Sequence, residues 1–377
     1  MDWLNNLKLK SKDAGVRRSM IEKLGATRNP KALGWICESL GDDMSEVRAS
    51  AAAALVNFPE EKSLELLVGA LQDPAAEVRE AAATSLGRME DARACEHLVP
   101  VLRDAAPNVR GSVAAALRNL GWVADNAESQ ALFEVAIGNV KAAAFRGVAA
   151  VNPLVEELKH DTAFARRAAA EALASVKDPR RVEPLIEAAT DPDPTVRASA
   201  LHALSQENSE AVTNALLRAF SDPEAHVRLA AAQVLCKRED KTLVPYFAGL
   251  LGDSHFEVRL NAVQYLGKCR DDQYAGYLVP MLNDADSDVR LAAARALGET
   301  GCPDAIEYLV IVLTDEERAV RQAAETALTR IDPAWAQSEA AQRAAVQLET
   351  AMGTRPEWVR GAAAQVLTRI NQACQVS

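Results

Sequence analysis

Hydrophobic side chains recur along the chain in a pattern that matches one face of an α-helix. In the stretch from Val196 to Leu204, apolar residues lie one position before Arg197 and three, four and seven positions after it. This spacing places them in a single stripe along a helix. Another apolar run, from Glu183 to Ala189, precedes this stretch, and the Asp-Pro cluster between them predicts a tight turn. The segment is therefore expected to form a helix, a turn and a second helix.

The pattern returns at intervals of 31 residues. An arginine marks the same position of the second helix in two series, which are Arg17, Arg48, Arg79 and Arg110, and then Arg166, Arg197, Arg228, Arg259, Arg290 and Arg321. A regular period of this length is typical of an array in which each unit packs only on its neighbours. We therefore expect residues 1–377 to form one all-α domain. Its predicted form is a right-handed α-α superhelix, an α-solenoid of about eleven or twelve helical hairpins.

A first interruption follows Arg110. The frame points next to Lys141, but Arg166 comes only 25 residues later, so this unit has lost six residues. The sequence predicts an irregular joint at about 121–165, with a first helix over roughly 126–137 and a second helix that ends early, near Asn152-Pro153. Aromatic residues are concentrated in this joint, which favours either a joint repacked by large side chains or a bent seat for a partner. These aromatic residues are Trp122, Phe133, Phe145 and Phe164.

A second interruption adds eight residues between Arg321 and Arg360. It predicts a C-terminal cap at about 332–377. Trp335 and Trp358 are expected to cover the last apolar face there, because a terminal unit has no neighbour on one side.

An aspartate stands six residues before the arginine in most units. It is expected to accept hydrogen bonds from backbone N–H groups at the turn and to pair with the arginine of its own or the adjacent unit. An exposed pair of this kind contributes about 0 to 1 kcal/mol. We therefore predict a structural ladder that sets turn geometry and register, and no catalytic role. The residues assigned to it are Asp191, Arg197, Asp222, Arg228, Asp253, Arg259, Asp284 and Arg290.

Composition supports close helix packing and argues against some partners. Aromatic residues make up 5% of the chain and hydrophobic residues 49%, so alanine, leucine and valine must form the core. Glycines that follow the apolar stripe, such as Gly25, Gly87, Gly267 and Gly298, are interpreted as helix ends. The net charge of -11 disfavours binding to nucleic acid or to an anionic membrane. With no apolar run of secretory or membrane-spanning length, the expectation is a soluble cytoplasmic protein.

The repeated residues resemble a known family. Proline or alanine before a short first helix, aspartate in the turn, arginine six residues later and then AAxALG are similar to HEAT repeats of the phycobilisome-lyase-like (E-Z) subtype, from about Gly15 to Ile370. The resemblance implies a HEAT-like solenoid. It is poorly specific for function, because members include interaction scaffolds, phycobilin lyase subunits and deoxyhypusine hydroxylase.

Residue patterns for catalysis or cofactor binding are missing from the sequence. The iron-binding hydroxylase relative needs His-Glu dipeptides, and none of the five histidines is followed by glutamate. The six cysteines form no CxxC pair and are interpreted as free buried thiols. A DNA glycosylase of this fold needs a basic inner face, whereas the inner positions here carry mixed charge. We therefore predict no catalytic residues, no metal site and no cofactor.

The inner wall of the solenoid offers the best candidate for a functional site. Positions one, five and nine residues after the repeat arginine are expected to face this concave wall. In three successive units they form a row of leucines with amide and charged neighbours, as in a protein-binding groove. The alternative is that these leucines pack against the neighbouring second helix. The predicted binding residues are Leu229, Gln233, Lys237, Leu260, Gln264, Lys268, Leu291 and Arg295.

The expected function is a noncatalytic scaffold or adaptor that binds a protein or peptide partner in this concave groove. The alternative is a phycobilin lyase-like or chaperone-like subunit that presents a pigment or a protein to another enzyme. The sequence predicts neither the identity of the partner nor the oligomeric state.

Overall fold

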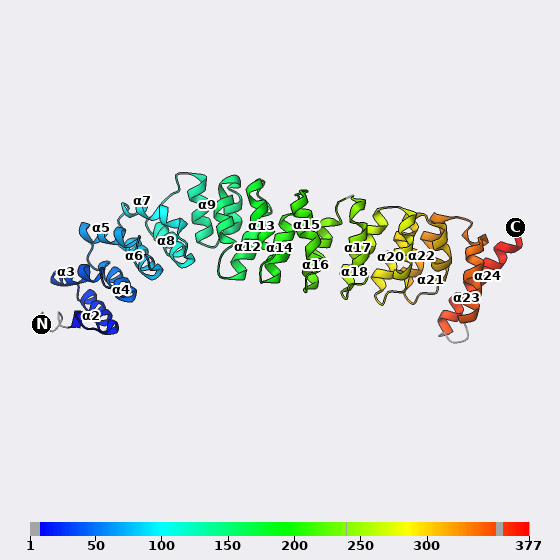
Figure 1. Cartoon of the computed structure of the whole chain (residues 1–377), viewed down its shortest axis with the longest axis horizontal. Coiled ribbons are helices and arrows are strands. Elements are labelled where there is room, and N and C mark those ends of the chain that lie inside the picture. The colour runs from blue at the N-terminus through cyan, green and yellow to red at the C-terminus, as the bar shows by residue number, and fades with distance from the viewer. Residues whose placement is uncertain (1–7, 239, 352–356, 377) are drawn as a thin grey trace. The chain divides into compact units, whose positions relative to one another are not determined.

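The computed structural model describes residues 8–238, 240–351 and 357–376, and these residues form α-helices and short 3-10 helices with no strand (Figure 1). The 23 α-helices among them, α2 to α24, follow one another as helical hairpins, so the prediction of an all-α solenoid of helix pairs is confirmed. The chain divides into two compact units, Met1–Pro184 and Leu185–Ser377. That all 377 residues form a single solenoid stays a prediction.

The helices are short, and first and second helices of successive hairpins alternate along the chain. Those of the first unit are α2 (Ala14–Thr27), α3 (Pro30–Ser39), α4 (Ser45–Leu55), α5 (Glu61–Ala70), α6 (Ala76–Arg88), α7 (Ala94–Leu98), η1 (Val99–Arg103), α8 (Pro107–Asn119), α9 (Ala127–Ala136), α10 (Val140–Ala144), η2 (Gly147–Ala150), α11 (Val151–Glu157), α12 (Ala163–Leu173) and η3 (Pro179–Arg181). Helix α13 (Val182–Ala188) contains the boundary. Those of the second unit are α14 (Pro194–Ala203), α15 (Glu210–Ala219), α16 (Ala225–Leu235), η4 (Lys241–Leu243), α17 (Val244–Leu250), α18 (Phe256–Lys268), η5 (Asp272–Tyr274), α19 (Ala275–Leu278), η6 (Val279–Asn283), α20 (Ser287–Thr300), η7 (Pro303–Ala305), α21 (Ile306–Val312), α22 (Arg318–Ile331), η8 (Trp335–Gln337), α23 (Glu339–Ala351) and α24 (Glu357–Val376).

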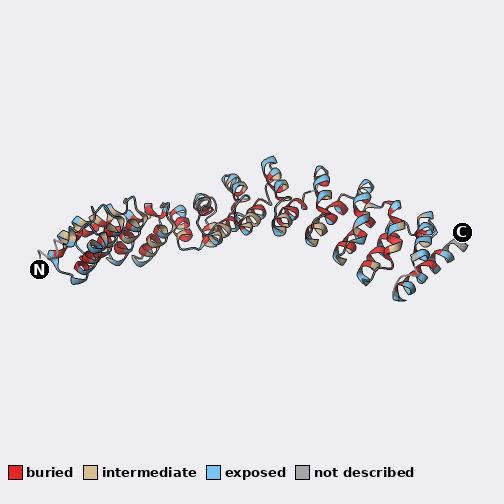
Figure 2. Ribbon diagram, turned by 60° about the horizontal axis from the view of Figure 1, so that its bottom comes forward, coloured by how far each residue is buried: buried red, intermediate tan, exposed pale blue. Residues whose placement is uncertain are grey.

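Within each unit the second helices of successive hairpins pack on one another. In the first unit α2 contacts α4, α4 contacts α6 and α6 contacts α8, and in the second unit α14, α16, α18, α20 and α22 form a similar series. The residues that face these neighbours are mainly alanine, valine and leucine and are fully buried, for example Val289, Ala293 and Leu297 of α20. Figure 2 shows buried residues on the facing sides of the helices and exposed residues on the outer sides.

Four glycines predicted to mark helix ends lie in the last turn of their helices, each against an alanine of the next second helix. A Cβ atom added to Gly87 would lie 2.5 Å from the Cα atom of Ala116, and one added to Gly267 would lie 2.7 Å from the Cβ atom of Ala296. Gly25 and Gly298 face Ala54 and Ala327 in the same way, with 2.8 Å to the alanine Cβ atom in each case. These glycines do lie at helix ends, but close packing on an alanine, and not a left-handed cap, explains the residue type. These glycines let successive second helices approach backbone to backbone, which no larger residue permits.

The repeat arginines link the turn of one 31-residue repeat to the turn of the next repeat. Arg259 donates from Nε and Nη2 to the carboxylate of Asp284 at 2.7 Å each, and from Nη1 to the backbone carbonyl of Asp253 at 2.9 Å. The side chain therefore pairs with the aspartate 25 residues ahead, and the backbone of its own turn accepts the remaining bond. The same bidentate pairing joins Arg17 to Asp42, Arg48 to Asp73, Arg79 to Asp104, Arg197 to Asp222, Arg228 to Asp253 and Arg290 to Asp315.

These pairs are mostly buried, although each rung of the ladder was expected to be exposed. The side chains of Arg259 and Asp284 are 14% and 6% exposed. Burial by itself would raise the pKa of Asp284, but the hydrogen bonds from Arg259 and from the backbone N–H of Asp286 outweigh it and lower that pKa. Each aspartate also holds its own turn, because its Oδ1 accepts from the backbone N–H two residues later, as Asp253 does from His255 at 2.8 Å.

The helices of the shortened repeat differ in part from those predicted. Its first helix, α9, spans Ala127–Ala136 and agrees with the expected range, but the second helix does not reach Asn152-Pro153. Helix α10 stops at Ala144, a glycine with a φ of +61° follows at position 147, and α11 begins at Val151. The Asn-Pro pair thus lies in the first turn of α11. A proline is tolerated there, because the N–H groups of the first turn have no partner within the helix.

The C-terminal segment contains one buried and one exposed tryptophan. Trp335 is fully buried, and the guanidinium of Arg369 lies 4.6 Å from its ring centroid. Trp358, expected to cover the same apolar face, remains half exposed. The cysteines at positions 37, 95, 236, 269 and 302 are free thiols, two of them buried, and the side chain of Cys374 lies outside the described residues. None of the described helices combines the length and the apolar character needed to cross a membrane.

Candidate protein-binding surface

The predicted binding residues lie on three successive second helices of the second unit. Helix α16 carries Leu229 and Gln233, and Lys237 follows its end. Helix α18 carries Leu260, Gln264 and Lys268, and α20 carries Leu291 and Arg295. All three leucines are half-buried, and the amide and charged side chains beside them are exposed.

A hollow of about 390 Å³ brings five of these eight residues together. Leu260, Gln264 and Lys268 line it from α18, and Leu291 and Arg295 line it from α20. The row on α16, Leu229, Gln233 and Lys237, does not line it. We call this feature the leucine hollow; its other lining residues are Gly267, Asp288, Ala292, Ala296 and Glu299.

Small residues create the leucine hollow. Gly267 and Ala296 meet at the crossing of α18 and α20, where there is no room for a larger side chain. Leu260 and Leu291 therefore stand beside a floor without bulky groups, and each keeps part of its side chain uncovered. An uncovered leucine pair at the base of a recess is the kind of surface that accepts an apolar side chain of a partner.

Charges of both signs surround the leucine hollow. Lys268 and Arg295 contribute cations, and Asp288 and Glu299 contribute anions. Lys268 Nζ lies 3.4 Å from the backbone carbonyl of Cys236, so this cation leans toward the end of α16. Glu299 is 4.0 Å from Arg330 of α22. A mixed polar rim of this type orients a partner more than it contributes affinity.

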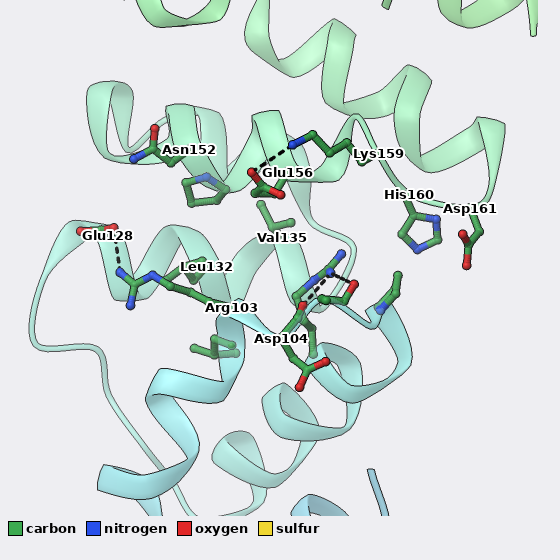
Figure 3. A pocket seen from close by; sticks show the side chains of 15 residues that line it. Arg103, Asp104, Glu128, Leu132, Val135, Asn152, Glu156, Lys159, His160 and Asp161 are labelled. Atoms are coloured by element: carbon green, nitrogen blue, oxygen red, sulfur yellow. Dashed lines mark hydrogen bonds and ion pairs between the residues drawn. The ribbon is translucent and has the colours of Figure 1, made fainter. Parts of the chain in front are cut away.

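A larger hollow, which the sequence did not predict, lies in the first unit at the shortened repeat. Its volume is about 510 Å³, and its lining comes from η1, the start of α8, α9, α11 and the turn that follows α11 (Figure 3). Leu102, Leu132, Val135 and Pro153 form its apolar part. The sequence signal for it was the break in the 31-residue frame, which marked the joint but not the cavity.

Ion pairs occupy the polar side of this larger hollow. Arg103 donates to Glu128 at 2.8 Å, and Lys159 lies 3.5 Å from Glu156 (Figure 3). Arg110 donates to Glu157 at 2.8 Å. Glu157 replaces the ladder aspartate here, because position 135, 25 residues after Arg110, is a valine.

The aromatic residues of the joint divide into a packed pair and an exposed pair. Trp122 and Phe133 contact each other with ring centroids 5.7 Å apart. Phe145 is 90% exposed and Phe164 is 72% exposed, and the guanidinium of Arg167 lies 5.6 Å from the Phe164 ring centroid. Only part of the joint is therefore repacked by large side chains.

Comparison with known families matches this architecture. The family model described as HEAT repeats matches six segments of the chain, residues 2–86, 35–118, 68–149, 151–226, 215–284 and 276–368. No curated protein sequence matches the chain.

Several solved structures are similar to the chain at low identity. An engineered protein is 21% identical, with 98% of each chain covered and a TM-score of 0.33. The Escherichia coli protein YibA is 20% identical, with 77% of this chain and 96% of that chain covered and a TM-score of 0.36. Human deoxyhypusine hydroxylase in complex with glycerol is 20% identical, with 79% and 94% covered and a TM-score of 0.29.

Proposed function

Because the chain belongs to the HEAT-repeat family, we propose that it is a noncatalytic scaffold that holds a protein partner on the second helices of its second unit. The observation that supports this proposal is the leucine hollow, where Leu260 and Leu291 remain partly uncovered between α18 and α20. Two half-buried leucines with small residues beneath and charged residues around them resemble the apolar centre and polar rim of a protein interface.

The chemistry of the leucine hollow suits a helix or an extended segment that inserts one or two apolar side chains. A volume of about 390 Å³ accommodates a few side chains and not a folded domain. The charges on the rim are balanced, with Lys268 and Arg295 opposite Asp288 and Glu299, so a partner segment of mixed charge is favoured over a strongly acidic or basic one.

The test is a double substitution of the two leucines. Leu260→Asp with Leu291→Asp places two carboxylates in the hollow and should abolish capture of the partner from a native lysate. Because both side chains are only half-buried, helicity and the melting temperature should remain close to those of the parent. Bound proteins are identified by quantitative mass spectrometry after affinity capture.

A matched control comes from the third leucine. Leu229 has the same position in its repeat and is also half-buried, but it does not line the hollow. Leu229→Asp should therefore leave capture intact. Equal capture by the parent and the Leu260/Leu291 variant would refute the proposed site, and equal loss in the Leu229 variant would show that the loss is not specific to the hollow.

The finer assignment to the phycobilisome-lyase-like subtype, with its pigment-presenting function, stays a prediction. Mixing the purified chain with a bilin and recording the absorbance spectrum tests it, since a held tetrapyrrole should show a red-shifted band. An unchanged spectrum would remove this alternative.

A further inference from the structure

The last arginine of the 31-residue series lacks the aspartate that its counterparts bind. In seven rungs, Nε and Nη2 of the arginine donate to the carboxylate of an aspartate 25 residues ahead. Position 346, which is 25 residues after Arg321, is a valine, and position 354, six residues before Arg360, is a threonine. Among residues 8–238, 240–351 and 357–376, Arg321 forms no ion pair. The ladder therefore ends in an arginine without its carboxylate.

Backbone contacts hold Arg321 as they hold the other ladder arginines. Its Nη1 donates to the backbone carbonyls of Asp315 at 2.6 Å and Glu316 at 2.9 Å. Nη1 of Arg259 donates to the equivalent carbonyls of its own turn, at positions 253 and 254, at 2.9 and 3.3 Å. Because a guanidinium is planar and rigid, this contact leaves Nε and Nη2 as the edge that binds a carboxylate in the other rungs.

Another arginine that lacks its aspartate pairs with a different acid. The residue 25 positions after Arg110 is also a valine, and there Glu157 of α11 accepts from Nη2 of Arg110 at 2.8 Å. A ladder arginine therefore recruits a carboxylate where the packing supplies one. Around Arg321 the described residues supply none.

Arg321 lines a hollow of about 470 Å³ between α22 and α24. Arg318 and Glu325 line it from the same helix, and Val366 and Arg369 line it from α24. We call this hollow the open rung. It gives a side chain from another molecule room to reach the guanidinium of Arg321.

Positive charge predominates in the open rung. Its lining contains three arginines and one carboxylate, which leaves an excess of two positive charges in a chain whose net charge is -11. The carboxylate, Glu325, already pairs with Arg369 at 2.6 Å, whereas Arg318 forms no salt bridge within the described residues. Asp315 and Glu316 of the adjoining turn pair with the preceding ladder arginine and do not line the hollow. The open rung is therefore complementary to an anion.

We propose that the open rung binds an aspartate presented by a turn of an acidic partner protein. The seven complete rungs show that this arginine edge takes a carboxylate in a bidentate pair, and each of those carboxylates lies in a turn. Arginine clusters recognise acidic segments of proteins in the same way.

A second copy of the chain is a poor occupant. The aspartates of the seven rungs already pair with arginines of their own chain. At the other end of the series, position 11, six residues before Arg17, is a serine, so the first turn offers no spare ladder aspartate. The partner is therefore a different protein, and its binding does not depend on the leucine hollow.

The experiment uses the full chain, labelled with ¹⁵N, and the peptide LQDPAAEV, which has the sequence of residues 71–78 and carries the ladder aspartate Asp73. Nuclear magnetic resonance follows the Nε–H signal of Arg321, which is assigned by its loss in Arg321→Lys. The peptide should shift this signal in a saturable manner. A second peptide with Asp73→Asn should bind about five- to tenfold more weakly, because it cannot form the charged bidentate pair.

Variants of the chain locate the site, with affinity measured by isothermal titration calorimetry. Arg321→Gln should weaken peptide binding by roughly five- to tenfold. Arg318→Gln should weaken it by about two- to threefold, and it leaves the turn contacts of Arg321 intact. The matched control is Arg360→Gln, which removes an exposed arginine of α24 that does not line the hollow, and it should bind like the parent. Melting temperatures close to that of the parent show that the variants are folded.

Several results would overturn the proposal. These are an unchanged Arg321 signal at saturating peptide, equal affinity for the aspartate and asparagine peptides, or parent affinity in both Arg321→Gln and Arg318→Gln. Inorganic phosphate that shifts the Arg321 signal at the same concentration as the peptide would assign the open rung to free anions instead. Self-association of the parent that Arg321→Gln abolishes in sedimentation velocity would assign it to a second copy. The Leu260→Asp and Leu291→Asp variant should bind the peptide normally, so failure of this proposal and failure of the proposed function are separate outcomes.

Discussion

Replacing Gly267 with alanine adds a single methyl group at the tightest kind of contact in this fold. Gly267 lies in the last turn of α18 and faces Ala296 of α20. The new Cβ atom would lie 2.7 Å from the Cβ atom and 3.0 Å from the Cα atom of Ala296, whereas ordinary contacts are 3.4–4 Å. Because one of the two neighbours is a backbone atom, no rotation of a side chain relieves the overlap. The two helices must separate by several tenths of an ångström.

Two opposing terms set the expected change in the free energy of unfolding. Alanine is favoured over glycine inside a helix by about 1 kcal/mol. Forcing an extra methyl group into a packed contact costs about 1–3 kcal/mol. The net effect of Gly267→Ala is therefore a loss of up to about 2 kcal/mol, although the same substitution is stabilising in an ordinary helix.

The control is a glycine in a helix with open space beside it. Gly34 lies in the middle of α3, is exposed, and an added Cβ would meet no atom within 4 Å. Gly34→Ala should therefore stabilise the chain by about 1 kcal/mol. Urea unfolding followed by circular dichroism at 222 nm measures both variants. The difference between them, about 1–3 kcal/mol, reports the packing term at Gly267.

A double-mutant cycle with Ala296→Gly isolates the contact itself. Removing the methyl group of Ala296 makes room for that of the alanine at position 267, so the double variant should be more stable than the two single effects predict, by about 0.5–3 kcal/mol. If Gly267→Ala stabilises the chain as much as Gly34→Ala, or if the cycle shows no coupling, the backbone-to-backbone packing inferred for α18 and α20 is wrong.

Three further predictions concern the ladder and the thiols. Asp284→Asn should lower the free energy of unfolding by about 1.5–3 kcal/mol in urea titrations, because Arg259 loses a charged, mostly buried acceptor. The pKa of Asp284 is lower in the folded state than its ordinary value, so its carboxylate stabilises the fold above the unfolded pKa of about 3.9. This contribution is lost as the pH falls through the lower folded pKa. The free energy of unfolding of Asp284→Asn should therefore depend less steeply on pH in that window. Burial raises the pKa of Cys37, Cys95 and Cys269, so iodoacetamide at pH 8 should modify them more slowly than a free peptide thiol, and a rate equal to that of the peptide would contradict the described burial.

Much of the fold follows from local residue patterns. The arginine period and the apolar stripe locate the second helices, because a helix such as α14 (Pro194–Ala203) must bury one face and the Asp-Pro cluster before it ends the preceding helix. Two features did not follow. The role of Gly267 depends on how closely two helices approach. The break between α10 and α11 contains Gly147, whose φ is positive. Neither feature is visible in a hydrophobic pattern.

The candidate site was predicted in part for the same reason. Helical periodicity places Leu260 and Leu291 beside each other, and both line one hollow. It also places Leu229 in the same row, yet the hollow does not extend to α16, because its extent depends on the side chains that fill each helix crossing. The sequence also shows a valine 25 residues after Arg321, but whether another carboxylate takes the place of the missing aspartate depends on the packing of α24, and packing requires coordinates.

The leucine hollow and the close helix crossing have the same physical origin. Gly267 and Ala296, which let α18 and α20 approach each other, also line the hollow together with Leu260 and Leu291. A methyl group added at position 267 would separate the helices and change the floor of the hollow in one step. Gly267→Ala should therefore reduce both stability and partner capture, whereas Leu260→Asp with Leu291→Asp should reduce capture alone. If capture survives in Gly267→Ala in spite of lower stability, the partner contacts the rim and not the floor.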